Sequence, residues 1–237
     1  MIQGFYSAVT GASQQMKQMD VHGNNIANVN TYGFKAEKPS FQALMYDMVD
    51  GVDGERLPKG SGTLMASTAT DFSSVGLTQT GRNLDYAIEG EGFFALYDPD
   101  TEEISYTRDG SFTLASFDGD DGDGWYLSDG QGRLVLDADE EPIKVTDPKK
   151  LQPVGVFTIQ YQDGLQHVDS SRFVASKKNG DIEAEDITVL QGYLESSNTD
   201  LAAELGKVIE AQRAYTYALR MVTTADEVET TINNLTT

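Results

Sequence analysis

Apolar residues recur at both ends of the chain with the spacing of a helix that packs along one narrow seam. The N-terminal seam consists of Ile2, Phe5, Val9, Ala12, Met16, Met19 and Ile26. The C-terminal seam consists of Leu201, Leu205, Val208, Gln212, Tyr215, Leu219 and Val222. Such alternation of three- and four-residue steps is typical of helices that pair through a coiled-coil face. Each end therefore predicts one long helix, and Ser197 or Asn198 is the expected N-cap of the second.

Neither helix can bury its seam alone, because an isolated helix gains most of its stability from packing against a partner. The two helices can pair with each other, with the middle of the chain or with other copies of the protein. We favour pairing among many copies, with the helices becoming ordered on assembly, over a simple hairpin within one chain.

The stretch "NNIANVNTYGFK" follows the first helix and carries four asparagines. Asparagine and glycine tolerate the left-handed backbone that closes helices, so the stretch predicts a helix end and a turn. An ordinary C-cap would explain Asn28 and Gly33 but not the number of amides. Because amides both donate and accept hydrogen bonds, we expect this segment to contact neighbouring subunits as well as its own turn. The expected contact residues are Asn24, Asn25, Asn28, Asn30, Gly33 and Phe34, with Phe34 anchored in an apolar pocket.

The middle of the chain changes to period-two alternation with turn signals, which is typical of short antiparallel strands. Asp109-Gly110 and Asp163-Gly164 predict hairpin tips, and "WYLSDGQGRLVL" predicts a strand, a turn and a strand. Residues 36–74 are expected to be an irregular connector, with a helical hint at "FQALMYDMVDG". The predicted fold class is α+β, with terminal helices forming a coiled-coil layer and a central all-β antiparallel domain. The expected divisions are 1–35, 36–74, 75–190 and 191–237.

The net charge of −21 argues against binding to nucleic acids or to anionic membranes. Residues 1–38 carry two acids and three bases, whereas residues 39–189 carry 29 acids and 11 bases. This distribution favours ends that pack against protein and a middle that faces water. There is no cysteine and no apolar run long enough for a transmembrane helix, and the first residues lack the pattern of a cleavable signal peptide.

The sequence offers little for catalysis or metal binding. His22 and His167 are expected to be ordinary surface or interface residues rather than a catalytic pair. The acidic loop 118–124 lacks the ligand spacing of an EF-hand, and we expect a solvated hairpin loop there. Arg213 flanks the C-terminal seam and is expected to pair with Glu204 or Glu210 of a neighbouring helix. No cofactor, metal ion or catalytic residue is predicted.

Three long segments, in order, resemble the bacterial flagellar rod and hook proteins. They are "GFYSAVTGASQQMKQMDVHGNNIANVNTYGFKAEKPSFQAL", "GRNLDYAIEGEGFFAL" with "SYTRDGSF", and "GYLESSNTDLAAELGKVIEAQRAYTYALRMVTTADEV". The resemblance implies a non-enzymatic axial protein of the flagellar basal body. Its terminal helices would stack with those of other copies as a tube around the export channel, with the β domain outside.

The same resemblance implies export through the flagellar type III apparatus without a cleaved signal, and contacts with other copies and with neighbouring rod or hook proteins. The compact length favours the proximal and distal rod proteins over the larger hook proteins, which stay an alternative. A secreted carbohydrate-active enzyme and an adhesin-like binding module are the remaining alternatives. The enzyme would depend on its acidic loops, and the module would bind as a monomer without needing its helices.

Overall fold

The structure, a computed structural model, describes residues 2–44, 46–50, 56–60, 62–119, 122–169 and 171–235. The chain forms two compact units. Unit 1 comprises Met1–Ala27, Glu37–Thr70 and Asp200–Thr237, and unit 2 comprises Asn28–Ala36 and Asp71–Thr199. Both ends of the chain therefore belong to unit 1, together with the segment Glu37–Thr70.

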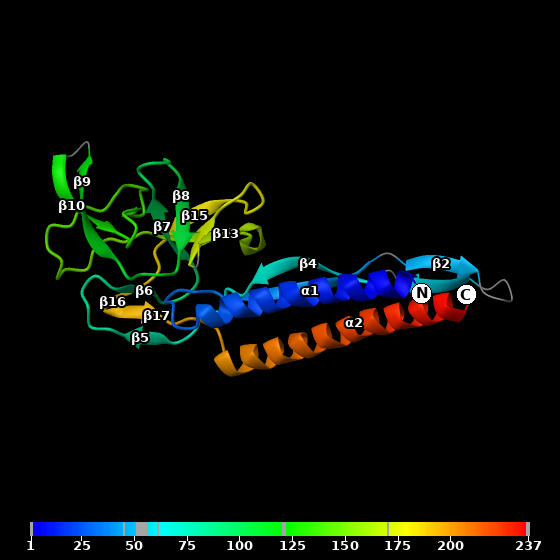
Figure 1. The fold of residues 1–237 in the computed structure, drawn as a ribbon. Coiled ribbons are helices and arrows are strands. Elements are labelled where there is room, and N and C mark those ends of the chain that lie inside the picture. The colour runs from blue at the N-terminus through cyan, green and yellow to red at the C-terminus, as the bar shows by residue number, and fades with distance from the viewer. Residues whose placement is uncertain are drawn as a thin grey trace. The chain divides into compact units, whose positions relative to one another are not determined.

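Unit 1 is built on two long helices, α1 (Ile2–Ala27) and α2 (Leu201–Leu235). They lie side by side and run in opposite directions (Figure 1). The expected α+β fold, with a helix at each end and an antiparallel β domain between them, is confirmed. The helices pair within one chain, the arrangement that the sequence analysis ranked second. Neither helix, as far as it is described, has an apolar stretch that could cross a membrane.

The N-cap of α2 is Asp200, not Ser197 or Asn198. The Asp200 Oδ1 atom accepts hydrogen bonds from the backbone nitrogens of Ala202, at 2.9 Å, and Ala203, at 3.2 Å. These bonds satisfy two of the backbone donors that a helix leaves free at its start. Asn198 instead accepts a hydrogen bond from the backbone nitrogen of Ala36 at 2.7 Å.

The expected irregular connector is wrong for most of residues 36–74, because the chain forms two antiparallel ribbons there. The first pairs β1 (Glu37–Ala43) with β4 (Thr63–Thr70), and the second pairs β2 (Tyr46–Asp50) with β3 (Arg56–Gly60). The β1–β4 ribbon packs along α1 (Figure 1). Its strands are mostly exposed and lack the apolar alternation that reveals a strand in sequence. The helical hint at "FQALMYDMVDG" is likewise wrong.

Unit 2 contains short antiparallel strands in one large sheet and two small ribbons. The strands of the large sheet are β7 (Phe93–Tyr97), β8 (Ile104–Thr107), β9 (Thr113–Gly119), β10 (Gly122–Ser128), β11 (Leu134–Val135), β12 (Val156–Ile159), β13 (Gln166–Asp169), β14 (Arg172–Val174) and β15 (Ile182–Glu185). The ribbons pair β6 (Tyr86–Ile88) with β16 (Val189–Gln191) and β5 (Leu77–Gln79) with β17 (Tyr193–Glu195). A short 3-10 helix, η1 (Gln162–Gly164), follows β12. In each ribbon a strand from the beginning of the β region, β5 or β6, pairs with a strand from its end, β17 or β16.

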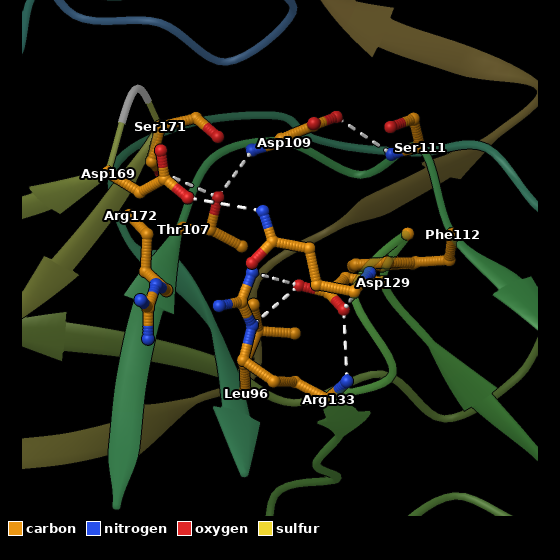
Figure 2. Close-up of a pocket in the computed structure, with 12 residues that line it drawn as sticks. Leu96, Thr107, Asp109, Ser111, Phe112, Asp129, Arg133, Asp169, Ser171 and Arg172 are labelled. Carbon is orange, nitrogen blue, oxygen red and sulfur yellow. Dashed lines mark hydrogen bonds and ion pairs between the residues drawn. The ribbon is translucent and has the colours of Figure 1, made fainter. Parts of the chain in front are cut away.

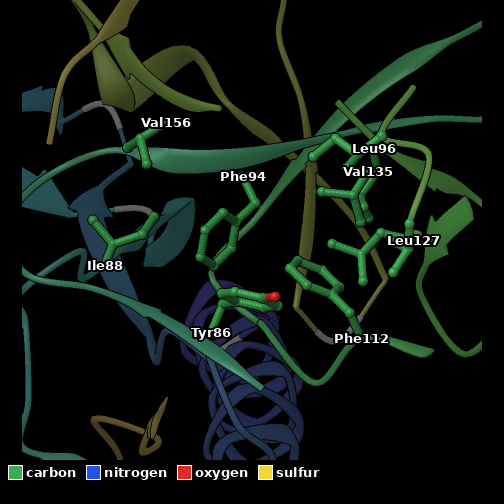
Figure 3. Close-up of a cluster of buried hydrophobic side chains, with 10 residues drawn as sticks. Tyr86, Ile88, Phe94, Leu96, Phe112, Leu127, Val135 and Val156 are labelled. Carbon is green, nitrogen blue, oxygen red and sulfur yellow. The ribbon is translucent and has the colours of Figure 1, made fainter. Parts of the chain in front are cut away.

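Strand β7 lies at the centre of the large sheet and is covered on both faces. Phe94 and Leu96 point into one apolar cluster, where they meet Tyr86, Phe112 and other buried side chains (Figure 3). The alternate residues Phe93 and Ala95 belong to a second cluster. Because successive side chains of a strand point to opposite faces, β7 supplies both cores of the unit.

The local turn signals predicted the hairpins only in part. β10 and β11 pair across "SDGQGR", as expected, and β7 and β8 pair across the "DPDT" turn. Asp109-Gly110 is not a hairpin tip, since β8 pairs with β7 and β14 while β9 pairs with β10. A side chain at Gly110 would overlap the carbonyl of Tyr86, so close backbone approach explains this glycine. Asp163-Gly164 lies in η1, and β12 and β13 pair with other strands.

Candidate functional site

In its described part, helix α1 buries three polar residues beside two apolar ones, Ala12 and Val21, whereas half of its described apolar seam is exposed. Gln14, His22 and Asn25 are buried, and the Gln14 side chain accepts a hydrogen bond from the backbone of β4. In contrast, 42% of Val9 and 49% of Met16 are exposed. The described members of the expected seam differ in burial: Phe5, Val9 and Met16 are exposed, Met19 and Ile26 are half-buried, and Ala12 is buried. Ile2 lies in α1, but its side chain is outside the described part.

Helix α2 turns a face of small residues and one acid inward. Its inner face, defined by buried or half-buried side chains with heptad spacing, consists of Glu204, Val208, Ala211, Tyr215, Ala218, Val222 and Ala225. The expected seam shares Val208, Tyr215 and Val222 with this face. Its other members, Leu201, Leu205, Gln212 and Leu219, lie one position away from the inner residues or beyond them and are exposed. Arg213 is exposed as well.

Large apolar side chains consequently cover the outside of the helical hairpin. We call this set the outer apolar surface. It consists of Phe5, Tyr6, Val9 and Met16 on α1 and of Leu201, Leu205, Ile209, Tyr217, Leu219, Met221, Val228, Ile232 and Leu235 on α2. Single exposed apolar residues are ordinary, whereas a series of them along both helices is a candidate interaction surface.

A buried polar cluster joins the two helices. His22 Nδ1 lies 2.5 Å from Glu204 Oε2, and Lys207 Nζ donates to Glu204 Oε1 at 2.8 Å. Burial alone would raise the pKa of Glu204, but hydrogen bonds from Lys207, His22 and Asn25 outweigh it and lower this pKa below its usual value. His22 is thus a buried helix-contact residue rather than an ordinary surface one, and Glu204 is already occupied within its own chain.

The described side-chain hydrogen bonds of the asparagine-rich segment are made within the chain itself. Asn25 is fully buried, and its amide donates to the carbonyl of Glu37 at 2.8 Å and accepts from the Glu37 nitrogen at 2.9 Å. Asn28 forms a turn with Thr31 through side-chain and backbone hydrogen bonds. Asn24 and Asn30 are exposed. Contacts of this segment with neighbouring copies stay a prediction.

Gly33 and Phe34 hold the turn within unit 2. Gly33 has φ +66°, and a side chain there would overlap the backbone at Arg108 and Asp109. Its nitrogen donates to the carbonyl of Glu195 at 2.9 Å. Phe34 is 1% exposed, as expected of an anchor residue. Gly33 therefore permits both a left-handed turn and a close backbone approach.

A buried ion triad in unit 2 links segments that are far apart in sequence. Glu195 Oε1 lies 2.7 Å from Lys35 Nζ, and Glu195 Oε2 lies 3.3 Å from Arg108 Nη1. Lys35 also donates to the carbonyl of Ser73, and Arg108 to that of Gly90. Burial lowers the pKa of Lys35 and of Arg108, although Glu195 opposes the shift in both. The triad thereby joins the segments that follow α1 and precede α2, and nothing in the sequence marks these three residues as partners.

Asn198 adds to the same junction. Its side-chain amide donates to the carbonyl of Asp71 at 2.6 Å, and its oxygen accepts from the nitrogen of Ala36. The backbone nitrogen of Asp71 in turn donates to the carbonyl of Ala36 at 2.9 Å. We call the segments 31–36, 71–79 and 193–199 the junction; amides and buried ions hold all three together within unit 2.

Unit 2 also has a polar cavity of about 260 Å³, between the turns that follow β8, β10 and β13 (Figure 2). Asp129 is bound by Arg133, whose Nε donates at 2.7 Å, and Asp169 accepts from Gln131 at 3.2 Å. Burial raises the pKa of Asp109, which accepts from the Ser111 nitrogen at 2.9 Å. These carboxylates already have partners in the turns, so the geometry indicates turn stabilisation.

The acidic loop considered for calcium lies partly outside the described residues, since 120 and 121 and the side chains of 118–123 are not described. His167 lies on β13, where its ring contacts Phe173. Among the described residues, no cluster of three or more histidines or acids has the arrangement of a metal site.

Three family models match successive parts of the chain. "Flagella basal body rod protein" matches residues 5–35, "Flagellar hook protein FlgE/F/G D1 domain" matches 87–193, and "Flagellar basal body rod FlgEFG protein C-terminal" matches 190–235. The chain is 29% identical to the flagellar basal-body rod protein FlgG of Bacillus subtilis, with 99% of each chain covered. It is 28% identical to FlgG of Caulobacter vibrioides, with 96% of this chain and 97% of the relative covered.

A hook protein is similar over a smaller share of its length. The flagellar hook protein FlgE of Treponema pallidum is 32% identical over 70% of this chain, which is 39% of the hook protein. The matched models run from α1 through the β unit to α2, in the order of the structural elements. The chain therefore belongs to the family of bacterial flagellar basal-body rod and hook proteins.

Proposed function

We propose that the chain is a non-enzymatic structural subunit of the flagellar basal-body rod, and that it polymerises through the outer apolar surface of its helical hairpin into an axial tube. The observation that carries this proposal is the exposure of large apolar side chains on helices that bury polar ones. Gln14, His22 and Asn25 are buried, with hydrogen-bond partners in β4, α2 and β1 respectively, while Val9 and Met16 stay exposed. Burying exposed apolar side chains against neighbouring copies supplies the driving force for assembly.

Assembly requires contacts that do not close on themselves. A patch of one copy that binds a different patch of the next copy builds a helical filament. The outer apolar surface extends over two antiparallel helices, so α1 of one copy can contact α2 of another. The exposed members of the expected seams, with Gln212 and Arg213 on α2, belong to this proposal. Val208, Tyr215 and Val222 instead lie on the inner face of α2.

The junction suits a subunit that carries mechanical load. Force on either helix reaches unit 2 through the segments 31–36 and 193–199, which Glu195, Lys35 and Asn198 bind together. Buried ion pairs and bidentate amides resist shear better than solvated contacts because their partners are fixed and desolvated. In this proposal the junction transmits torque between the helical layer and the β layer.

A rod position is favoured over a hook position by length. The rod relatives match this chain over nearly their full length, whereas the chain spans 39% of the hook relative. The proposal includes export through the flagellar type III apparatus without a cleaved signal, and a place in the rod outside the cytoplasm. An extracytoplasmic location is consistent with the absence of cysteine.

Charge substitutions on the outer apolar surface test this function. Val9→Asp or Leu219→Asp places a charge where a neighbouring copy would bury it, so we expect loss of rod assembly and of swimming in a strain that depends on the variant. Leu151→Asp is the matched control, since Leu151 is apolar and exposed but lies in unit 2. Circular dichroism should show all three variants folded. Normal motility of both helix variants would contradict the proposal.

A further inference from the structure

A polar contact between His22 and Glu204 joins the two helices. It differs in kind from the apolar contacts along the rest of the described helix pair. His22 and Glu204 face each other at 2.5 Å and are 2% and 5% exposed. Gln18 Nε2 lies 3.5 Å from the other ring nitrogen of His22, and Lys207 holds the second oxygen of Glu204. These contacts lie within unit 1, between the last turns of α1 and the first turns of α2.

The rest of the inner face of α2 is nearly periodic. Ala211, Ala218 and Ala225 follow one another at heptad spacing, and Val208 and Val222 are two heptads apart. If α2 slid along α1 by one heptad, alanine would replace alanine at the contact. In the other row a slip would exchange Tyr215 with a valine, so this half-buried tyrosine adds some preference for one register. The alanine row, where the exchanged volumes are equal, adds none.

The polar contact discriminates strongly. Glu204 is the one acid on the inner face of α2, among the described residues. Gln15 occupies the position one heptad before His22, and Val29, one heptad after it, lies beyond the end of α1. In either slipped register Glu204 would lose its imidazole partner. A buried carboxylate that loses a hydrogen-bond donor is strongly disfavoured.

We propose that the His22–Glu204 pair specifies the register of α1 against α2, while the periodic small and apolar residues supply the attraction. A single buried polar residue fixes register in coiled coils in the same way, at some cost in stability. Register decides which exposed side chains of the two helices stand next to each other. That consequence for assembly rests on the proposed function, but the register itself is a property of one chain.

The test replaces both polar residues by apolar ones of similar size, as His22→Leu with Glu204→Met. The chain has no cysteine, so Lys17→Cys and Glu227→Cys place spin labels at two exposed helix positions that are well separated along the helix axis. Distances between the labels are measured by pulsed electron paramagnetic resonance in the full-length protein. We expect one narrow distance with the native pair. The apolar variant should add populations displaced along the axis by about 10 Å per heptad, without a lower melting temperature.

The control variant weakens the apolar contacts between the two helices and keeps the His22–Glu204 pair. Val208→Ala with Val222→Ala should lower the melting temperature of the helices and preserve the single narrow distance. One narrow distance in the apolar variant, or several distances with the native pair, would overturn the inference. Failure of the proposed function would appear separately, as an absence of polymerisation with the register intact.

Discussion

Replacing Glu195 by alanine should destabilise unit 2 more than any exposed substitution. The change leaves Lys35 and Arg108 without their carboxylate, and these side chains are 1% and 4% exposed. Removing one partner of a buried ion pair costs about 3–5 kcal/mol, because the remaining charge stays desolvated. For a unit of this size that corresponds to a fall in melting temperature of roughly 10–17 °C.

The loss of stability in the Glu195→Ala variant should become smaller as the pH rises. Burial already lowers the pKa of Lys35 from 10.5, and loss of Glu195 lowers it further. Between the folded and unfolded pKa values the unfolded chain binds more protons, so stability rises with pH. The Glu195→Ala variant should therefore recover part of its stability as the pH rises from 7 towards 10.

Thermal denaturation followed by Trp125 fluorescence measures the effect in unit 2. Glu183→Ala on β15 is the control, because Glu183 is an exposed glutamate in the same unit. It should change the free energy of unfolding by less than about 0.5 kcal/mol. If Glu195→Ala cost no more than Glu183→Ala, the triad would not hold the junction.

Two further predictions concern single residues. Gly33→Ala should lower the free energy of unfolding of unit 2 by about 2 kcal/mol, because Gly33 has a positive φ and lies close to the backbone of Arg108. Chemical denaturation measures this change. Gly130→Ala is the control, because a side chain at Gly130 would extend into open space. The lowered pKa of Glu204 predicts that its contribution to helix stability is complete above its usual value of 4.5 and is lost as the pH falls below it. Thermal unfolding followed by far-UV circular dichroism at pH 6 and at pH 3.5 measures the difference in helix stability between the two pH values. Glu204→Gln should reduce this difference, whereas Glu210→Gln, at an exposed position, should not. An unchanged difference in the Glu204→Gln variant would refute the assignment.

Both helices and the end of the first could be predicted from sequence because their signals are local, whereas the N-cap predicted for the second is wrong. Spacing alone identified α1 and α2, and Asn28 with Gly33 indicated where the first helix stops. Which face is buried is a tertiary property, since Gln14 and His22 find partners in β4 and α2 that no periodicity reveals. The expected seam of α1 therefore describes its apolar stripe correctly but not its intrachain contact.

The β unit shows the limit of turn signals. Asp109-Gly110 has the composition of a hairpin tip, but its glycine serves the close approach to Tyr86, and the strands on either side pair elsewhere. The triad of Lys35, Arg108 and Glu195 joins residues separated by 87 and 160 positions. Single charged residues in unrelated segments carry no mark of their partners, so a sequence cannot predict such a site.

Hydroxyl-radical footprinting of the free subunit and of the assembled rod tests the central claim most directly. Tyr217 on α2 and Tyr161 in unit 2 are matched probes, with 63% and 57% of their surface exposed. If neighbouring copies bury the outer apolar surface, modification of Tyr217 and of Met221 should fall strongly in the rod, and more than that of Tyr161. Equal modification of Tyr217 in the free and assembled protein would contradict assembly through the outer apolar surface.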